Sequence, residues 1–87
     1  MSYKIAIAKK AFKELATLPV KDNLQIVEAI DHLKENPRPV GCKKLKGESE
    51  DIWRIRVGDY RVLYCIDDII RIVEIRRIGH RKDIYDR

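Results

Sequence analysis

The residues best suited to chemistry are arginines concentrated in one short stretch, Trp53–Tyr64. In residues 53–57 apolar and basic residues alternate, so Arg54 and Arg56 share one face of a predicted strand. A planar guanidinium group binds phosphate oxygens through two hydrogen bonds and keeps its charge at neutral pH. Arginines on one strand face therefore indicate a site for phosphate or another anion.

The dipeptide Gly58-Asp59 separates this strand from a second alternating segment and suits a tight type II′ turn. A two-residue loop places Arg56 directly opposite Arg61 on the neighbouring strand. Like charges facing each other destabilise a sheet. An anionic ligand lying across this face is the simplest reason to keep them.

The arginine face also has a purely structural interpretation. A symmetric turn at residues 67–68 places Glu74 opposite Arg61 on its other side. Arg61 and Glu74 would then form a surface ion pair worth about 0–1 kcal/mol, with the other arginines solvated. We favour a phosphate clamp, because Arg81 follows the next predicted strand and adds another guanidinium group near the same place.

Two side chains near the C-terminus could act in proton transfer or base binding. Histidine is the side chain that most often transfers protons at neutral pH, so His80 is a candidate, although a lone histidine is more often structural. Tyr85 could stack on a base, donate a proton or cover the edge of the core. Stacking on a base would contribute about 1–3 kcal/mol.

The predicted elements that position these residues form an α+β domain. A first strand covers residues 3–8, helices cover 9–18 and about 20–36, and a strand over 69–78 follows the hairpin and ends at Gly79. We expect both helices to cover one face of an antiparallel sheet whose last three strands form a meander. The residues expected to face the helices are Trp53, Ile55, Val57, Val62, Val73 and Ile75.

A basic segment, residues 40–50, precedes the hairpin and reads as a loop. Its lysines could guide a polyanion such as RNA, although a solvated connector is the simpler interpretation. The lysines concerned are Lys43, Lys44 and Lys46.

Composition narrows the class of protein. The 87 residues are enough for one small domain, expected over residues 1–87, and the net charge of +5 favours a polyanion or an acidic protein as partner. The two cysteines are far apart, and the two histidines have no ligand spacing, so we expect no disulfide, metal or cofactor. Because no leader or long apolar run is present, we expect a soluble, cytoplasmic protein without membrane contact.

Four segments together resemble the RelE/ParE toxin superfamily. They are Leu45–Gly47, Trp53–Tyr64, Ile78–Arg81 and Ile84-Tyr85. The resemblance extends over nearly the whole chain, including the opening strand and two helices. It implies a toxin of a type II toxin–antitoxin system. In the RelE branch, such a toxin is an endoribonuclease that cleaves messenger RNA in the ribosomal A site without a metal and inhibits translation.

The resemblance also implies roles for individual residues. Those it assigns to RNA cleavage are Arg54, Arg56, Arg61, Arg81 and Tyr85. The best-known RelE pattern carries lysines at the first two positions, and one of them can take the proton of the ribose 2′-hydroxyl. Arginine, with a pKa above about 12, is a poor base at neutral pH. We therefore expect proton transfer to involve His80, with Glu74 as a second choice.

The partners implied by the resemblance are a small acidic antitoxin encoded by a neighbouring gene, the ribosome and messenger RNA. The toxin–antitoxin complex would bind operator DNA. An open sheet face with Leu63, Cys65 and Ile72 offers a groove for an acidic amphipathic segment, unless the C-terminal tail folds back over it. Two other functions stay open: a non-enzymatic DNA gyrase inhibitor of the ParE branch, and a plain nucleic-acid-binding module.

Overall fold

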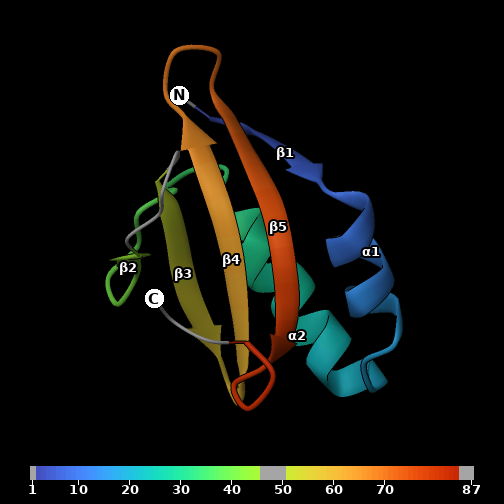
Figure 1. Cartoon of the computed structure of the whole chain (residues 1–87). Helices are drawn as coiled ribbons and strands as arrows, with labels where there is room; N and C mark the ends of the chain where they lie inside the picture. Colours follow the sequence, from blue (N-terminus) through green and yellow to red (C-terminus); the bar gives the residue numbers. More distant parts are fainter. Residues whose placement is uncertain (1, 46–50, 85–87) are drawn as a thin grey trace.

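The chain folds into two helices packed on a five-stranded sheet, in a computed structural model that describes residues 2–45 and 51–84 (Figure 1). The α+β class and the meander of the last three strands are confirmed. In chain order the elements are β1 (Lys4–Ile7), α1 (Lys9–Ala16), α2 (Val20–His32), β2 (Lys43–Leu45), β3 (Ile52–Val57), β4 (Tyr60–Asp67) and β5 (Ile72–His80).

The strand order across the sheet is β1-β5-β4-β3-β2, and β1 runs parallel to β5. The sheet is therefore mixed, whereas we expected an antiparallel one. The segment predicted as a loop, residues 40–50, contains the short edge strand β2, which pairs with β3. Three residues, two of them lysine, are too few to show strand periodicity, so only the pairing with β3 reveals β2.

The core lies between the helices and one face of the sheet. Ala11 and Leu15 of α1 and Ile26 and Ile30 of α2 are buried at a spacing of four residues, which places each pair on one helix face. The sheet residues that we expected to face the helices belong to this core or pack against it. Arg54, Arg56 and Arg61 alternate with these core residues and therefore lie on the other face of the sheet.

The connection between β4 and β5 is longer than expected. Asp67 pairs with Ile72, and the Asp67 carboxylate accepts the backbone N–H groups of Ile69 and Ile70, each at 3.0 Å. A carboxylate that caps a turn in this way replaces ladder bonds. The two isoleucines are exposed, and β5 begins at Ile72, so the strand predicted from residue 69 starts too early.

A register shift between Leu63 and Tyr64 moves the pairing of β4 and β5 by one more residue. As a result Gly79, inside β5, lies opposite Arg61, and Glu74 lies opposite Cys65. The predicted Arg61–Glu74 neighbours are therefore wrong. The Glu74 carboxylate instead forms an ion pair with Arg76 at 3.3 Å.

Asp68 joins three parts of the chain at the far end of the sheet. Its carboxylate accepts hydrogen bonds from Arg38 at 2.9 and 3.3 Å and from the Tyr3 hydroxyl at 2.6 Å. These bonds, with that from Arg38 as the larger cause, lower the pKa of Asp68 from 3.8 to about 2. The network ties the N-terminus and the α2–β2 connection to the β4–β5 turn.

We predict that Asp68→Asn reduces the loss of stability on acidification. Because the folded pKa of Asp68 lies below the unfolded value, its contribution is present above about pH 3.8 and is lost as the pH falls toward 2. Urea midpoints of both proteins, measured from pH 5 to about pH 2, should therefore converge at low pH. Parallel curves would contradict the prediction.

Candidate phosphate-binding site

Three arginine residues line one small pocket at the end of the sheet. Arg56 comes from β3, Arg61 from β4 and Arg81 from the residue after β5. The turn at 58–59 and Tyr60 complete the lining of this pocket, whose volume is about 60 Å³. We call it the arginine pocket.

Backbone geometry brings these arginines together. Gly58 has a φ of 61°, and Asp59 has a negative φ, as the predicted type II′ turn requires. The turn pairs Arg56 with Arg61, which confirms the predicted register. The N–H of Arg81 donates to the Asp59 carbonyl oxygen at 2.9 Å, and this bond ties the residue after β5 to the hairpin turn.

The pocket has the size and charge for a tetrahedral anion. Its volume of about 60 Å³ exceeds the roughly 10–15 Å³ that one ordered water requires, so the pocket admits a group larger than a single water. Guanidinium groups from three separate strand ends can approach different oxygens of one phosphate, and such charge-assisted hydrogen bonds are about twice as strong as neutral ones. Arg56 and Arg81 are exposed, so an anion can reach them from solvent.

The other basic candidates have different surroundings. Arg54 shares the face of Arg56, but it is only 6% exposed, so the alternative interpretation of a solvated side chain does not hold for Arg54. Lys43 lies opposite Arg54 on β2 and is exposed. Lys44 pairs with Trp53, so it faces the other side of the sheet, and it forms an ion pair with Asp51 at 3.3 Å. Lys46 and Tyr85 lie outside the described residues.

His80 lies beside the arginine pocket. It pairs with Tyr60 across β4 and β5, and the two rings meet edge to face with centroids 5.6 Å apart. The Nδ1 atom of His80 accepts the N–H of Lys82 at 3.1 Å. Tyr60, which lines the pocket and contacts His80, was missed by the sequence reasoning, although its place between the turn and Arg61 could have indicated it.

The tail after β5 packs onto the arginine face. Ile84 is 3% exposed, and a Cβ atom built on Gly79 would lie 2.8 Å from its Cδ1 atom. Gly79 lies opposite Arg61, so its missing side chain leaves room for Ile84 beside the arginines. Ile84 thus folds back against the sheet at Gly79, whereas the predicted cover over Leu63, Cys65 and Ile72 stays a prediction.

Glu14 of α1 bonds to β5 beyond Ile75, the last residue of β5 that pairs with β1. The Glu14 carboxylate accepts the N–H of Ile78 at 2.9 Å and binds the Arg77 guanidinium at 3.1 to 3.2 Å. Arg77 pairs with Leu63 at the register shift, directly before the residues that lead to Arg81. Glu14 thus holds the irregular part of β5.

We predict that Glu14→Ala destabilises the fold by about 1–3 kcal/mol, because the N–H of Ile78, a buried residue, would lose its acceptor. Glu14→Gln should cost less, since its amide oxygen can still accept that N–H. Urea unfolding of both variants measures the difference. Equal losses would mean that only the charge opposite Arg77 matters.

Comparison with known proteins identifies the family of this chain. A family model described as the ParE toxin of type II toxin–antitoxin systems matches residues 5–85. The chain belongs to this toxin family. Toxin RelG of Mycobacterium tuberculosis is 39% identical over 88 residues, which cover 100% of both chains. Toxin RelE of the same organism is 39% identical over 84 residues, covering 95% of this chain and 86% of that toxin.

A solved structure supports the same assignment. The toxin fold in the RelE–RelB complex of Pyrococcus horikoshii superposes on this chain with a TM-score of 0.83 and 31% identity, covering 97% of this chain and 100% of the other. The predicted membership of the RelE/ParE toxin superfamily is thereby confirmed. In the part of this chain that the structure describes, neither helix is long and apolar enough to span a bilayer.

Proposed function

We propose that this toxin is a ribosome-dependent endoribonuclease that cleaves messenger RNA in the A site without a metal. The observation that carries the proposal is the arginine pocket, in which Arg56, Arg61 and Arg81 converge on a space of about 60 Å³. The relatives named RelE and RelG toxins add support. Lys43 would extend the contact along the RNA backbone, and Arg54, Lys46 and Tyr85 remain proposed contacts. Lys44 faces the other side of the sheet, so it would contact a different part of the RNA.

In the proposed reaction, the ribose 2′-hydroxyl attacks the adjacent phosphorus atom. A bond from the 2′-oxygen to phosphorus forms, and the bond from phosphorus to the 5′-oxygen breaks. The products are a cyclic phosphate and a free 5′-hydroxyl. Negative charge grows on the non-bridging oxygens in the transition state, where the three guanidinium groups would stabilise it. The ribosome would position the messenger RNA, and positioning supplies much of the remaining acceleration.

We propose His80 as a proton-transfer group of this reaction. Its Nδ1 atom already accepts the Lys82 N–H, so Nε2 is the ring nitrogen left to face the substrate. With Nδ1 engaged, the neutral ring carries its hydrogen on Nε2. This neutral ring can donate a hydrogen bond but cannot give up a proton, so to act as an acid it must first bind a second proton at Nδ1 and release the Lys82 N–H. The imidazolium can then protonate the departing 5′-oxygen, and the 2′ proton passes to water.

His80→Gln should slow single-turnover cleavage on ribosomes by about 10²-fold, because a glutamine side chain can donate a hydrogen bond but cannot transfer a proton. The measurement is quench-flow analysis of a programmed ribosome with saturating toxin. His32→Gln, which changes an exposed histidine on α2, is the control. An unaltered rate in His80→Gln would remove His80 from the mechanism.

We also propose an antitoxin as the partner, since similar toxins have been solved as RelE–RelB complexes. We expect it to be small, acidic and encoded by a neighbouring gene, and the complex to bind operator DNA. The positive net charge of +5 on the toxin complements such a partner.

A second candidate function is inhibition of DNA gyrase, because the matching family model is that of the ParE toxin. Mapping RNA ends after induction of the toxin separates the two functions. Breaks within translated codons, each with a free 5′-hydroxyl, support the endoribonuclease. Intact messages together with inhibited supercoiling by purified gyrase would overturn it.

A further inference from the structure

The outer edge of β3 is uncovered next to the arginine pocket. β2 pairs with β3 only as far as the Lys43–Arg54 pair, so no strand borders Arg56 on that side in the part of the chain that the structure describes. The two-residue turn makes Val57 and Tyr60 a hydrogen-bonded pair, and backbone groups alternate in direction along a strand. The N–H and C=O groups of Arg56 therefore point away from β4, toward this edge.

A cleft of about 500 Å³ lies along the uncovered edge of β3. Three segments line it: α2 through Ala29, the α2–β2 connection through Pro39 and Val40, and β3 through residues 54–56. Because Arg56 also lines the arginine pocket, the two spaces adjoin at this residue. We call this space the β3 cleft.

The β3 cleft combines apolar surface with a few polar groups. Val40 is fully exposed, and Pro39 and Ala29 are half-buried. The N–H and C=O groups of Arg56 add a donor next to an acceptor. A nucleobase has matching features, since its faces stack on flat or apolar side chains and its Watson–Crick edge carries a donor next to an acceptor. The chemistry of the cleft is therefore that of a site for an unpaired base.

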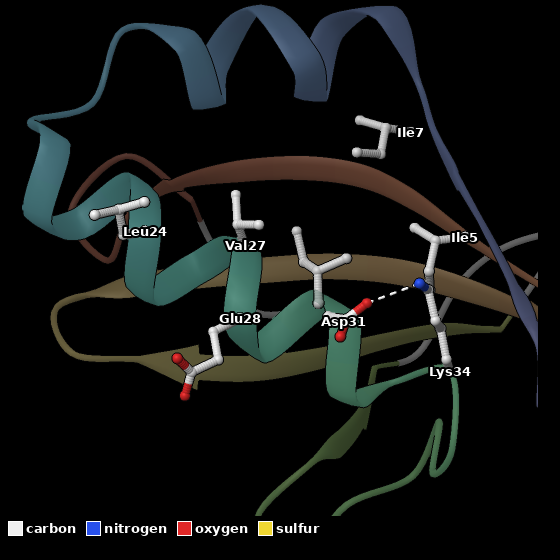
Figure 2. A pocket seen from close by; sticks show the side chains of 8 residues that line it. Ile5, Ile7, Leu24, Val27, Glu28, Asp31 and Lys34 are labelled. Atoms are coloured by element: carbon white, nitrogen blue, oxygen red, sulfur yellow. Dashed lines mark ion pairs between the residues drawn. The ribbon is translucent and has the colours of Figure 1, made fainter.

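Charge favours RNA in the β3 cleft over the groove on the other side of α2. That groove, between β1 and α2, is lined by Glu28 and Asp31, and Figure 2 shows Asp31 paired with Lys34, at 2.8 Å. Carboxylates at its wall repel an RNA backbone. Arg54 and Arg56 instead give the β3 cleft positive charge.

We propose that the β3 cleft binds the unpaired base of a messenger RNA nucleotide that flanks the cleaved bond. With the phosphate in the arginine pocket, Arg56 spans the step from that phosphate to the neighbouring base. The edge of the base would bond to the N–H and C=O groups of Arg56, and its face would stack on Pro39 and Val40. This inference rests on the proposed endoribonuclease function and adds a contact to the base itself.

Single-turnover cleavage on a programmed ribosome tests the base contact. An abasic ribose replaces, in turn, each of the two nucleotides that flank the cleaved bond, so the 2′-hydroxyl and the phosphates stay in place. At one of these positions, loss of the base should raise the toxin concentration for half-maximal cleavage by about 10- to 100-fold, as expected for one stacked base. Unchanged cleavage at both positions would overturn the proposal.

Val40→Ala tests whether that base lies in the β3 cleft. Val40 is fully exposed, so the fold should tolerate the change. Loss of two methyl groups that the base would cover should raise the half-maximal concentration about tenfold. The same substitution should have no effect on the sensitive abasic message, because the base it contacts is already absent. Ile69→Ala is the matched control, since Ile69 is 93% exposed on the β4–β5 turn and does not line the cleft.

Ala29→Leu fills the β3 cleft from the helix side. Leucine is a good helix former, and urea midpoints check that the variant is as stable as the unchanged toxin. The larger side chain should exclude the base and raise the half-maximal concentration about tenfold on the intact message only. A normal value on the intact message would overturn the proposal.

Two further outcomes separate the possible failures. An effect of Val40→Ala that persists on both abasic messages would assign the cleft to a ribosomal group and overturn the inference. If the unchanged toxin cleaves messenger RNA and both cleft variants behave like it, the proposed function stands and only the base site is wrong. If the unchanged toxin cleaves no programmed ribosome, the endoribonuclease function is overturned, and the base site with it.

Discussion

Replacing Arg61 with alanine is expected to lower single-turnover cleavage of messenger RNA on the ribosome by about 10³-fold. Arg61 lies at the centre of the arginine pocket, with Arg56 opposite it on β3 and Gly79 opposite it on β5. Its loss removes a charge-assisted donor from the place where phosphate oxygens gain charge in the transition state. The fold should survive, because the backbone pairing of β4 does not depend on this side chain.

The conservative change and a control separate charge from geometry at this position. Arg61→Lys keeps the charge but loses the two-pronged contact, so it should retain more activity than alanine. Arg76→Ala removes an arginine that bonds to Glu74 and Cys65 and does not line the pocket. It should leave cleavage unchanged. Growth arrest by Arg61→Ala at equal expression would count decisively against the phosphate clamp.

The β3–β4 hairpin was predictable because its determinants are local. Two residues, Gly58 and Asp59, set the turn type, and the turn then fixes the pairing of Arg56 with Arg61. The apolar positions that face the helices follow from strict alternation on either side of this turn. The positions of Arg56 and Arg61 in the arginine pocket could therefore be predicted from residues 53–64 alone.

The position of Arg81 and the burial of Arg54 depend on contacts between distant parts of the chain. The place of Arg81 follows from the turn capped by Asp67, from the register shift at Leu63 and from the Glu14 carboxylate on α1. Each of these moves β5 relative to β4, and a one-residue error reverses the face of every side chain that follows. The burial of Arg54 is equally non-local, since it lies opposite the unexpected strand β2.

The combined substitution of Arg61 and Arg81 is expected to cost less than the product of the two single substitutions. Arg81→Ala alone should slow cleavage by about 10²-fold, and Arg61→Ala by about 10³-fold. If both groups bind oxygens of the same phosphate in the arginine pocket, removing one already weakens the role of the other. We therefore expect the double variant to lose about 10³- to 10⁴-fold, rather than 10⁵-fold.

This double-mutant cycle distinguishes one phosphate site from two. Independent losses that multiply to about 10⁵-fold would mean that Arg61 and Arg81 contact different phosphates along the RNA. Lys82→Ala is the matched control, because Lys82 is exposed next to Arg81 but does not line the pocket. Coupling between Arg61 and Arg81 without coupling between Arg61 and Lys82 would show a local effect of shared phosphate binding. Coupling of equal size in both pairs would instead indicate a general effect of net charge on ribosome binding.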